Sequence, residues 1–355
     1  MAITSRDRVL TVLAGQPPDR VPINYAGNPD ITARLMKHFG LAEGDYEGLL
    51  EALGVDFRSV NAAYVGPALH EDIPGLSVDI WGIRRRYIEH SSGGYWDFCD
   101  FPLQDATQEQ VAAWPMPSPD DYDYSGILAA CERYDSYAIN GAAGYGDIIN
   151  GNGMLRGMEQ TLIDLVTDDP AGLLLADRRM AIQLEVTRRI LQEAQGRVDF
   201  LWLGEDLGTQ IAPLISLQTF RKHIRPRYQP FCDLAAAYDI RVMMHTCGSS
   251  SWAYEDFIEM GIHAVDTLQP EAQDMSPEYL KQTFGGRLAF HGCISTAGPL
   301  ANGSVEDVVA DVRHTLDVMM PGGGYCLAPT HMMQDNTPTE NALAMYETAH
   351  RYGVY

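Results

Sequence analysis

The residues of this chain best suited to chemistry are His245 and Cys247, which directly follow the short apolar run 242–244. The run is typical of a β-strand covered on both faces, and residues two positions apart on a strand project to the same side. An imidazole nitrogen and a thiolate are two ligands for a borderline-soft cation, and zinc is the first candidate. Because a His-x-Cys pair also occurs by chance, the pair alone does not establish a metal site. A third ligand must come from elsewhere in the chain.

The elements that must position these residues follow a regular pattern from residue 137 onward. Short apolar runs alternate with longer helical windows, at residues 137–141, 198–206, 240–247, 264–269, 288–293 and 325–331. Capping signals at Ser276, Ser304 and Thr337 mark helix starts between them. With two more short strands expected at residues 19–25 and 54–61, this alternation predicts an α/β fold: a single-domain (β/α)8 TIM barrel over residues 1–355. A doubly wound open sheet is the alternative, but no Gly-x-Gly-x-x-Gly turn follows a strand.

The segment up to about residue 119 is rich in glycine, proline and aromatic residues and does not follow this alternation. Residues 81–86 and 93–96 within it predict an inserted hairpin that leaves the main body and covers the barrel mouth. The three adjacent arginines at 84–86 suit an anionic substrate, although a solvated strand edge is the more ordinary interpretation.

The predicted barrel brings the carboxyl ends of its strands to one mouth, where active sites of this fold gather. A catalytic zinc takes three protein ligands and keeps one open position. We therefore expect His245, Cys247 and one further ligand, preferably His331, with Cys293 and Glu205 as alternatives. His331 could instead bond to a loop carbonyl, and Cys293 could be a small core residue. Side chains at the mouth that do not bind the metal are the acid/base and supporting candidates, namely Glu205, Asp206 and His291, although Glu205 and Asp206 also fit a helix start.

Composition limits the class of partner. Lysine and arginine total 25 against 48 acidic residues, a formal net charge of -23, which argues against nucleic acid and anionic membranes. No apolar run reaches the length of a membrane helix, and the amino terminus lacks the apolar core of a signal peptide. The six cysteines show no disulfide spacing, as expected in a reducing compartment. These features predict a cytoplasmic protein; the oligomeric state stays open.

Four stretches resemble the uroporphyrinogen decarboxylase superfamily: residues 19–22 (Asp-Arg-Val-Pro), 204–210, 245–248 (His-Thr-Cys-Gly) and 327–331 with 337–341. The resemblance covers nearly the whole chain and implies a (β/α)8 barrel. The superfamily includes decarboxylases of haem synthesis and zinc-dependent, corrinoid-linked methyltransferases.

The resemblance favours the methyltransferase branch. Decarboxylases hold their porphyrinogen with an arginine-rich amino-terminal segment and an aspartate on an early strand; here residues 22–30 contain no arginine, and Asn61 stands near the aspartate's place. The methyltransferases are marked by His-x-Cys and a late third ligand, usually cysteine. His245 and Cys247 match, but the late position carries His331, which leaves His/Cys/His or His/Cys/Cys through Cys293.

The resemblance thus implies a zinc enzyme that moves a methyl group between a small molecule or thiol and a corrinoid protein. The corrinoid must come from a partner, because the chain has no Asp-x-His-x-x-Gly segment of the kind that holds it. The alternatives are a uroporphyrinogen decarboxylase without cofactor and a barrel that binds a small molecule without turning it over.

Overall fold

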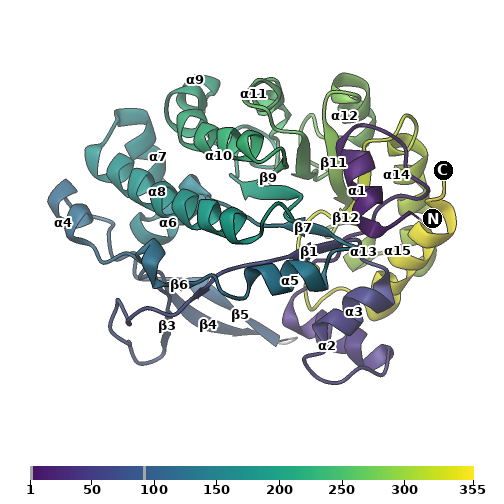
Figure 1. The fold of residues 1–355 in the computed structure, drawn as a ribbon, viewed down its shortest axis with the longest axis horizontal. Helices are drawn as coiled ribbons and strands as arrows, with labels where there is room; N and C mark the ends of the chain where they lie inside the picture. The colour runs from purple at the N-terminus through teal and green to yellow at the C-terminus, as the bar shows by residue number, and fades with distance from the viewer. Residues whose placement is uncertain (1–2, 91–92) are drawn as a thin grey trace.

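A curled parallel sheet of seven strands forms the centre of the protein, in the computed structural model that describes residues 3–90 and 93–355 (Figure 1). Its order is β1-β7-β8-β9-β10-β11-β12. Strands β10 and β11 are buried along their whole length, as expected for apolar strands covered on both faces. The strands are β1 (Phe57–Ser59), β7 (Ala138–Asn140), β8 (Phe200–Gly204), β9 (Arg241–Thr246), β10 (Ala264–Thr267), β11 (Ala289–Ile294) and β12 (Tyr325–Pro329). The predicted α/β fold is confirmed, and each predicted run from residue 137 onward coincides with one strand to within one residue of its end.

An extended segment near the amino terminus links the two edges of this sheet. The backbone N–H of Asn24 donates to the Leu327 carbonyl of β12 (2.9 Å), and the Leu327 N–H donates to the Pro22 carbonyl (2.8 Å). On the other side, the Asp56 N–H just before β1 donates to the Ile23 carbonyl (2.9 Å). Residues 22–24 therefore lie between β12 and β1, where the sequence pattern places a short strand, and the arrangement is TIM-like.

Helices surround the sheet, and Figure 1 shows α8, α10, α11 and α12 along one side of it. The main helices are α1 (Ser5–Leu13), α2 (Pro29–His38), α3 (Tyr46–Leu53), α4 (Gln108–Ala113), α5 (Ile127–Arg133), α6 (Ile148–Arg156), α7 (Met158–Thr167), α8 (Pro170–Glu193), α10 (Arg225–Ala237), α11 (Tyr254–Met260), α12 (Pro277–Phe284), α14 (Val305–Met319) and α15 (Thr339–Tyr352). Short turns are α9 (Leu217–Thr219), α13 (Pro299–Asn302), η1 (Pro119–Asp121), η2 (Phe220–Ile224) and η3 (Ser251–Ala253). Across residues 3–90 and 93–355, no helix has both the length and the apolar character of a membrane span.

Two of the three predicted helix caps are confirmed. Ser276 caps α12, and Ser304 forms a reciprocal capping box with Asp307 at the start of α14. The prediction for Thr337 is wrong: α15 begins at Thr339 after Pro338, and no side chain caps it. Thr337 is instead buried, and its hydroxyl has no hydrogen-bond partner.

We expect Ser304→Ala to lower the free energy of unfolding by about 1 kcal/mol, because the backbone N–H of Asp307 loses its acceptor. Ser304→Gly is the matched variant and should cost only about a few tenths of a kcal/mol. Urea denaturation measures both. An equal loss in the two variants would contradict the capping role.

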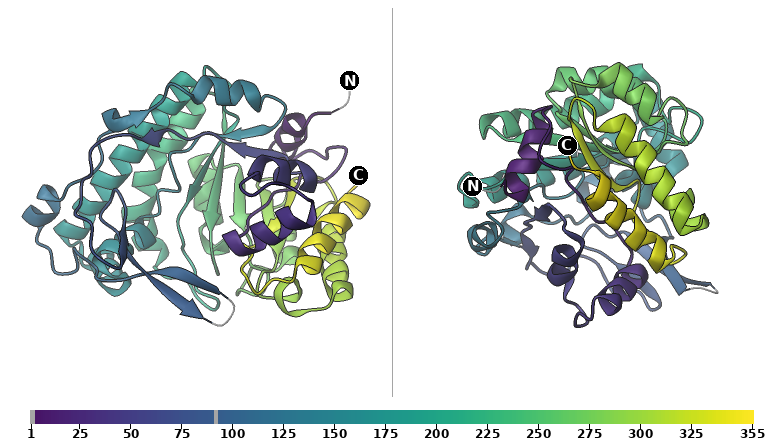
Figure 2. Two further views of the ribbon diagram at one scale, coloured as in Figure 1. Left: turned by 90° about the horizontal axis from the view of Figure 1, so that it is seen from below. Right: turned by 90° about the vertical axis from the view of Figure 1, so that its right-hand side faces the viewer.

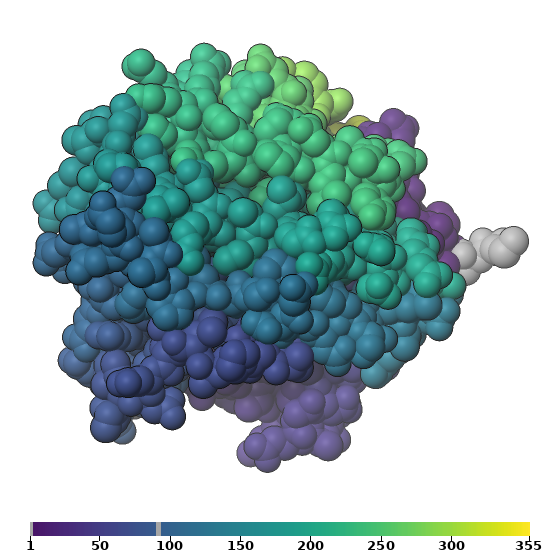
Figure 3. All heavy atoms as spheres, turned by 60° about the vertical axis from the view of Figure 1, so that its left-hand side comes forward, coloured from purple at the N-terminus to yellow at the C-terminus, as the bar shows by residue number. Residues whose placement is uncertain are grey.

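The predicted hairpin is present. Strand β4 (Arg84–His90) pairs antiparallel with β5 (Gly93–Phe98) and with β3 (Leu76–Val78). Figure 2 shows this sheet projecting from the body, and Figure 3 shows the blue atoms of the insert against the teal region. A small pair, β2 (Ala63–Tyr64) and β6 (Tyr122–Asp123), flanks the insert. Among the described residues, none from the hairpin lines the two cavities that contain Trp202, and its role as a cover of the mouth stays a prediction.

The insert packs against the outer helices. An apolar cluster joins Ile83 and Val111 of the insert to Leu155 of α6 and Leu175 of α8. Arg85 pairs with Asp79 (3.0 Å), and Arg86 approaches Asp100 (4.0 Å). These ion pairs fit the charged strand edge that the sequence favours for this segment.

Candidate metal centre

Three neighbouring strands place chemically active side chains side by side. In the parallel register, Asp266 of β10 pairs with His245 of β9 on one side and with His291 of β11 on the other. The three side chains therefore form a row across the carboxyl ends of the strands, where the sequence predicts that His245 and His291 converge.

Asp266 bridges the two histidines. One of its oxygens accepts from His245 Nδ1 (2.6 Å) and the other from His291 Nδ1 (2.5 Å). Burial raises the pKa of Asp266, but the two histidines outweigh burial and hold that pKa well below its usual range. Asp266 is therefore a buried carboxylate each of whose oxygens accepts from a histidine.

The second nitrogen of each histidine has a different environment. His291 Nε2 accepts from the Asn24 amide nitrogen (3.1 Å), whose orientation is set because Asn24 Oδ1 accepts from the Tyr25 N–H. His245 Nε2 points instead toward Cys247 Sγ, at 3.5 Å. Both nitrogens of His291 are thus engaged in protein contacts. In His245, a carboxylate holds Nδ1 and Nε2 faces a thiol, which is the arrangement of a metal-binding histidine.

A third donor lies beside this pair. Asp206, His245 and Cys247 form a group whose ligand atoms all lie within 4.8 Å of one another. The shortest separation between His245 Nε2 and the Asp206 carboxylate is 3.7 Å. A nitrogen, a sulfur and a carboxylate oxygen at these separations can converge on one zinc ion, and three protein ligands leave a position open.

The Asp206 carboxylate is fixed by its neighbours. One oxygen accepts from the backbone N–H of Cys247 (2.9 Å) and the other from the Asn150 amide of α6 (2.8 Å). Burial lowers the pKa of His245, but the hydrogen bonds to Asp266 and Cys247 outweigh burial and raise it well above its usual value. Metal binding at this group would therefore displace a proton.

The His245 side of the group borders a cavity of about 370 Å³. Tyr25, Tyr46, Tyr145 and Trp202 contribute aromatic rings to its lining, and His245, Asp266 and His291 contribute the polar wall. Tyr145 stacks on His245, with ring centroids 5.2 Å apart and planes 13° from parallel. No lysine or arginine is among the described residues that line this cavity.

The other proposed ligands lie apart from the group. His331 lines the same cavity but is exposed, and its Nδ1 bonds to the Met332 carbonyl (3.2 Å), which is the alternative that the sequence left open. Cys293 is buried in the core of β11, where burial raises the pKa of its thiol. The structure therefore brings Asp206, and none of the three predicted third ligands, next to His245 and Cys247.

Glu205 serves the fold at this end of the sheet. Its two oxygens accept from the backbone N–H groups of Ile148 and Ile149 (both 2.8 Å) at the start of α6. Burial and the nearby Asp147 raise the pKa of Glu205 well above its usual value. Glu205 thus binds the amino-terminal end of the distant helix α6 and does not start the helix that follows β8, and Asp206 lies next to His245 and Cys247.

Sequence reasoning missed Asp266 and Asn24. Asp266 lies inside the apolar run 264–269 and not at its polar end, Gln269, but it is in register with both histidines. The signal for Asp266 is its register with His245 and His291 on the neighbouring strands. Asn24 gave no such signal, because its role depends on residues 22–24 lying between β12 and β1.

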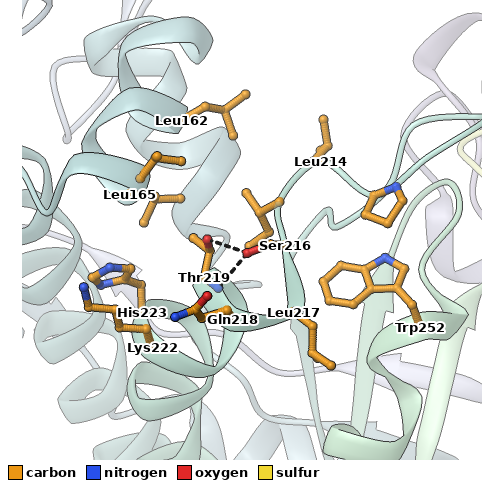
Figure 4. A pocket seen from close by; sticks show the side chains of 13 residues that line it. Leu162, Leu165, Leu214, Ser216, Leu217, Gln218, Thr219, Lys222, His223 and Trp252 are labelled. Carbon is orange, nitrogen blue, oxygen red and sulfur yellow. Dashed lines mark hydrogen bonds between the residues drawn. The ribbon is translucent and has the colours of Figure 1, made fainter.

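A larger cavity of about 830 Å³ lies outside the strand ends (Figure 4). Its wall is mostly apolar, with Leu162 and Leu165 of α7 on one side and Trp252 on another. Lys222 and His223, its titratable side chains among the described residues, both lie against Asp168 (2.6 and 2.8 Å). The described residues that line this cavity include no convergent set of catalytic groups, so the cavity beside His245 is the stronger candidate site.

Comparison with known proteins identifies the family. A family model described as uroporphyrinogen decarboxylase (URO-D) matches residues 163–352, more than half of the chain. The chain belongs to this family. The matched segment contains Asp206, His245, Cys247, Asp266 and His291.

A solved structure of a methyltransferase from Methanosarcina mazei is similar over 99% of this chain and 99% of its own, with a TM-score of 0.66. The sequence identity is 18%, so the likeness shows a shared fold. A search among curated proteins found no match.

Proposed function

We propose that this URO-D family protein is a zinc-dependent methyltransferase that moves a methyl group between a small-molecule substrate or thiol and a corrinoid protein. The observation that carries the proposal is the group Asp206, His245 and Cys247, with His245 on the cavity wall. Zinc in this position would supply Lewis acidity or hold a thiol substrate as its thiolate.

The chain's own residues would prepare the site for the metal. Asp266 holds the His245 Nδ1–H, so that the lone pair of Nε2 is directed toward Cys247. Asn150 and the Cys247 backbone hold the Asp206 carboxylate. Tyr145 lies flat on the His245 ring and shields it from water. His291, with both nitrogens engaged, positions Asp266 and has no free nitrogen for proton transfer.

Charge favours this function over decarboxylation of uroporphyrinogen. A porphyrinogen with many carboxylates needs cationic side chains around it. Of the described residues, Arg58 is the one arginine or lysine that lines either of these two cavities. Its guanidinium is already paired with Glu47 (2.6 Å).

We infer further that the whole chain forms one (β/α)8 domain, with residues 22–24 as the eighth strand. Hydrogen bonds on both sides of this segment support the inference. The proposed methyl transfer requires a corrinoid protein as partner. The acidic composition and the unpaired cysteines support a cytoplasmic location.

The test combines metal analysis with an assay. We expect about one zinc per chain in chelator-washed, zinc-reloaded protein and methyl transfer to or from a free corrinoid. Release of carbon dioxide from uroporphyrinogen without metal would overturn the proposal in favour of the decarboxylase. Zinc binding and small-molecule binding with neither activity would favour the non-catalytic barrel.

The identity of the third ligand gives a separate prediction. We expect Asp206→Asn to weaken zinc binding by about tenfold, because the amide keeps the acceptor for the Cys247 N–H but removes the negative charge. His331→Ala should change the affinity by less than about twofold. Competition with a chromophoric chelator measures both. The reverse order would make His331 the third ligand.

A further inference from the structure

A cavity of about 410 Å³ lies at the opposite end of the sheet from the metal group, at the amino-terminal ends of β9, β10 and β11. Arg241 begins β9, His263 directly precedes β10, and Arg287 shortly precedes β11. All three side chains line the cavity, and no acidic side chain is among the described residues that line it. We propose that this cavity binds a small monocarboxylate with an apolar body. The inference is independent of the proposed function.

His263 meets a hydrogen-bond donor at each of its ring nitrogens. The backbone N–H of Val242 donates to Nδ1 (3.2 Å), and Nη1 of Arg241 lies 3.2 Å from Nε2. Burial and the neighbouring Arg241 lower the pKa of His263, so its imidazole is neutral at neutral pH. A neutral imidazole has one N–H and one acceptor nitrogen. Because the Val242 N–H requires Nδ1 as its acceptor, Nε2 carries the proton, and two donors face each other.

An acceptor that both donors can reach would remove this conflict. Among the described residues, Arg241 forms no ion pair, and its guanidinium contacts the His263 ring. A carboxylate in the cavity would accept from Nη1 of Arg241 with one oxygen and from Nε2–H of His263 with the other. Hydrogen bonds between a guanidinium and a carboxylate are shorter and stronger than those between neutral groups. The pair of donors therefore favours an anion with two acceptor oxygens.

The helix ends around the cavity do not supply this acceptor. Helices α1, α11 and α12 end beside it, and carbonyl groups at the end of a helix attract cations. The carbonyls of Ile258 and Phe284 accept from backbone N–H groups of the residues that follow their helices. Arg287 donates to the Thr283 carbonyl of α12 (2.9 Å). Within the described chain, Arg241 donates to no carbonyl, so its charge is available to a ligand.

The charge and the wall of the cavity limit the kind of anion. Arg287 shares its charge with Glu255, to which it donates two hydrogen bonds (2.8 and 2.9 Å). Of the three basic side chains, Arg241 is therefore the one that can balance a ligand. One available charge suits a monoanion better than a phosphate dianion, whose second charge would have no partner. The apolar part of the lining would cover an apolar body, and includes Leu13, Ile258, Ile262 and Leu288.

Calorimetry on the chelator-washed protein tests the site, because without metal no carboxylate can bind to zinc. The probes are benzoate, benzyl alcohol and inorganic phosphate, which separate the contribution of the charge from that of the ring. We expect benzoate to bind at least about tenfold more tightly than either of the other two. Equal binding of benzyl alcohol, tighter binding of phosphate, or no binding of benzoate overturns the proposal.

Two variants connect the binding to this cavity. Arg241→Met should weaken benzoate binding at least about tenfold, because the cation is lost. His263→Asn keeps an acceptor for the Val242 N–H but loses the Nε2–H donor, and should weaken benzoate binding about three- to tenfold. Arg313→Met is the matched control for net charge, because Arg313 is exposed and lies on α14, outside the cavity. It should bind benzoate like the unchanged protein.

A spectroscopic measurement on the unchanged protein does not depend on the folding of any variant. In NMR spectra, benzoate should shift the ring-nitrogen resonances of His263 and leave those of His245 and His291 unchanged. Shifts at His245 or His291 without one at His263 would place the carboxylate at the metal group and overturn the proposal. Equal losses of benzoate affinity in Arg241→Met and Arg313→Met would show attraction by the net charge alone and would also overturn it.

Discussion

Replacing Cys247 with alanine is expected to weaken zinc binding by at least about 100-fold, since loss of an outer-shell partner of a metal ligand alone costs about 10–100-fold. Cys247 supplies the sulfur of the group, and its Sγ lies 3.5 Å from His245 Nε2. Two donors, a histidine and a carboxylate, would remain. They do not provide the three protein ligands of a catalytic zinc site.

The fold should survive this change. The hydrogen bond that Cys247 donates to Asp206 comes from its backbone N–H, so alanine retains it. The side chain is half-buried, and the cavity left by one sulfur is small. We therefore expect an unchanged far-UV spectrum and little change in the free energy of unfolding of the metal-free protein.

Zinc content and chelator competition measure the effect. Cys99→Ala is the control, because Cys99 is also half-buried but follows the hairpin strand β5, outside the metal group. The control should bind zinc like the unchanged protein. Full zinc occupancy in Cys247→Ala would remove the sulfur from the ligand set and with it the main support for the proposed function.

Much of this architecture could be predicted from the sequence because it depends on local patterns. The apolar runs around Leu203, Met244 and Phe290 are strands, since a strand covered on both faces must be apolar along its length. His245 and Cys247 could be found because residues two apart share a side of a strand. Their closeness to one another follows from that spacing alone.

The rest depends on contacts between distant segments, which no local pattern encodes. Asp206 and His331 both follow a strand, and only the three-dimensional path of each loop decides that Asp206 meets Cys247. His331 turns toward the Met332 carbonyl of its own loop instead. The row of His245, Asp266 and His291 likewise depends on the register of three strands.

Asp266 is the residue whose loss should disturb the most interactions. We expect Asp266→Ala to lower the free energy of unfolding of the metal-free protein by about 2–6 kcal/mol, because two buried Nδ1–H groups lose their acceptor at about 1–3 kcal/mol each. Zinc affinity should fall by about 10–100-fold, because the carboxylate that orients His245 is gone. Urea denaturation and chelator competition measure the two effects separately.

Asp266→Asn separates orientation from simple burial. His245 and His291 face different ends of this side chain, so an amide presents its oxygen to one histidine and its NH₂ group to the other. The Asn24 amide already fixes His291 with Nε2 as an acceptor and Nδ1 as a donor. His245 must then face the amide NH₂ group, which favours the tautomer with its proton on Nε2, the nitrogen that binds the metal. The asparagine variant should therefore recover much of the lost stability but little of the zinc affinity.

Asp177→Ala, which breaks an exposed ion pair with Arg227, is the control. It should lower the free energy of unfolding by less than about 1 kcal/mol and leave the zinc affinity unchanged. Recovery of zinc affinity together with stability in Asp266→Asn would mean that Asp266 fills space at this site and does not set the His245 tautomer.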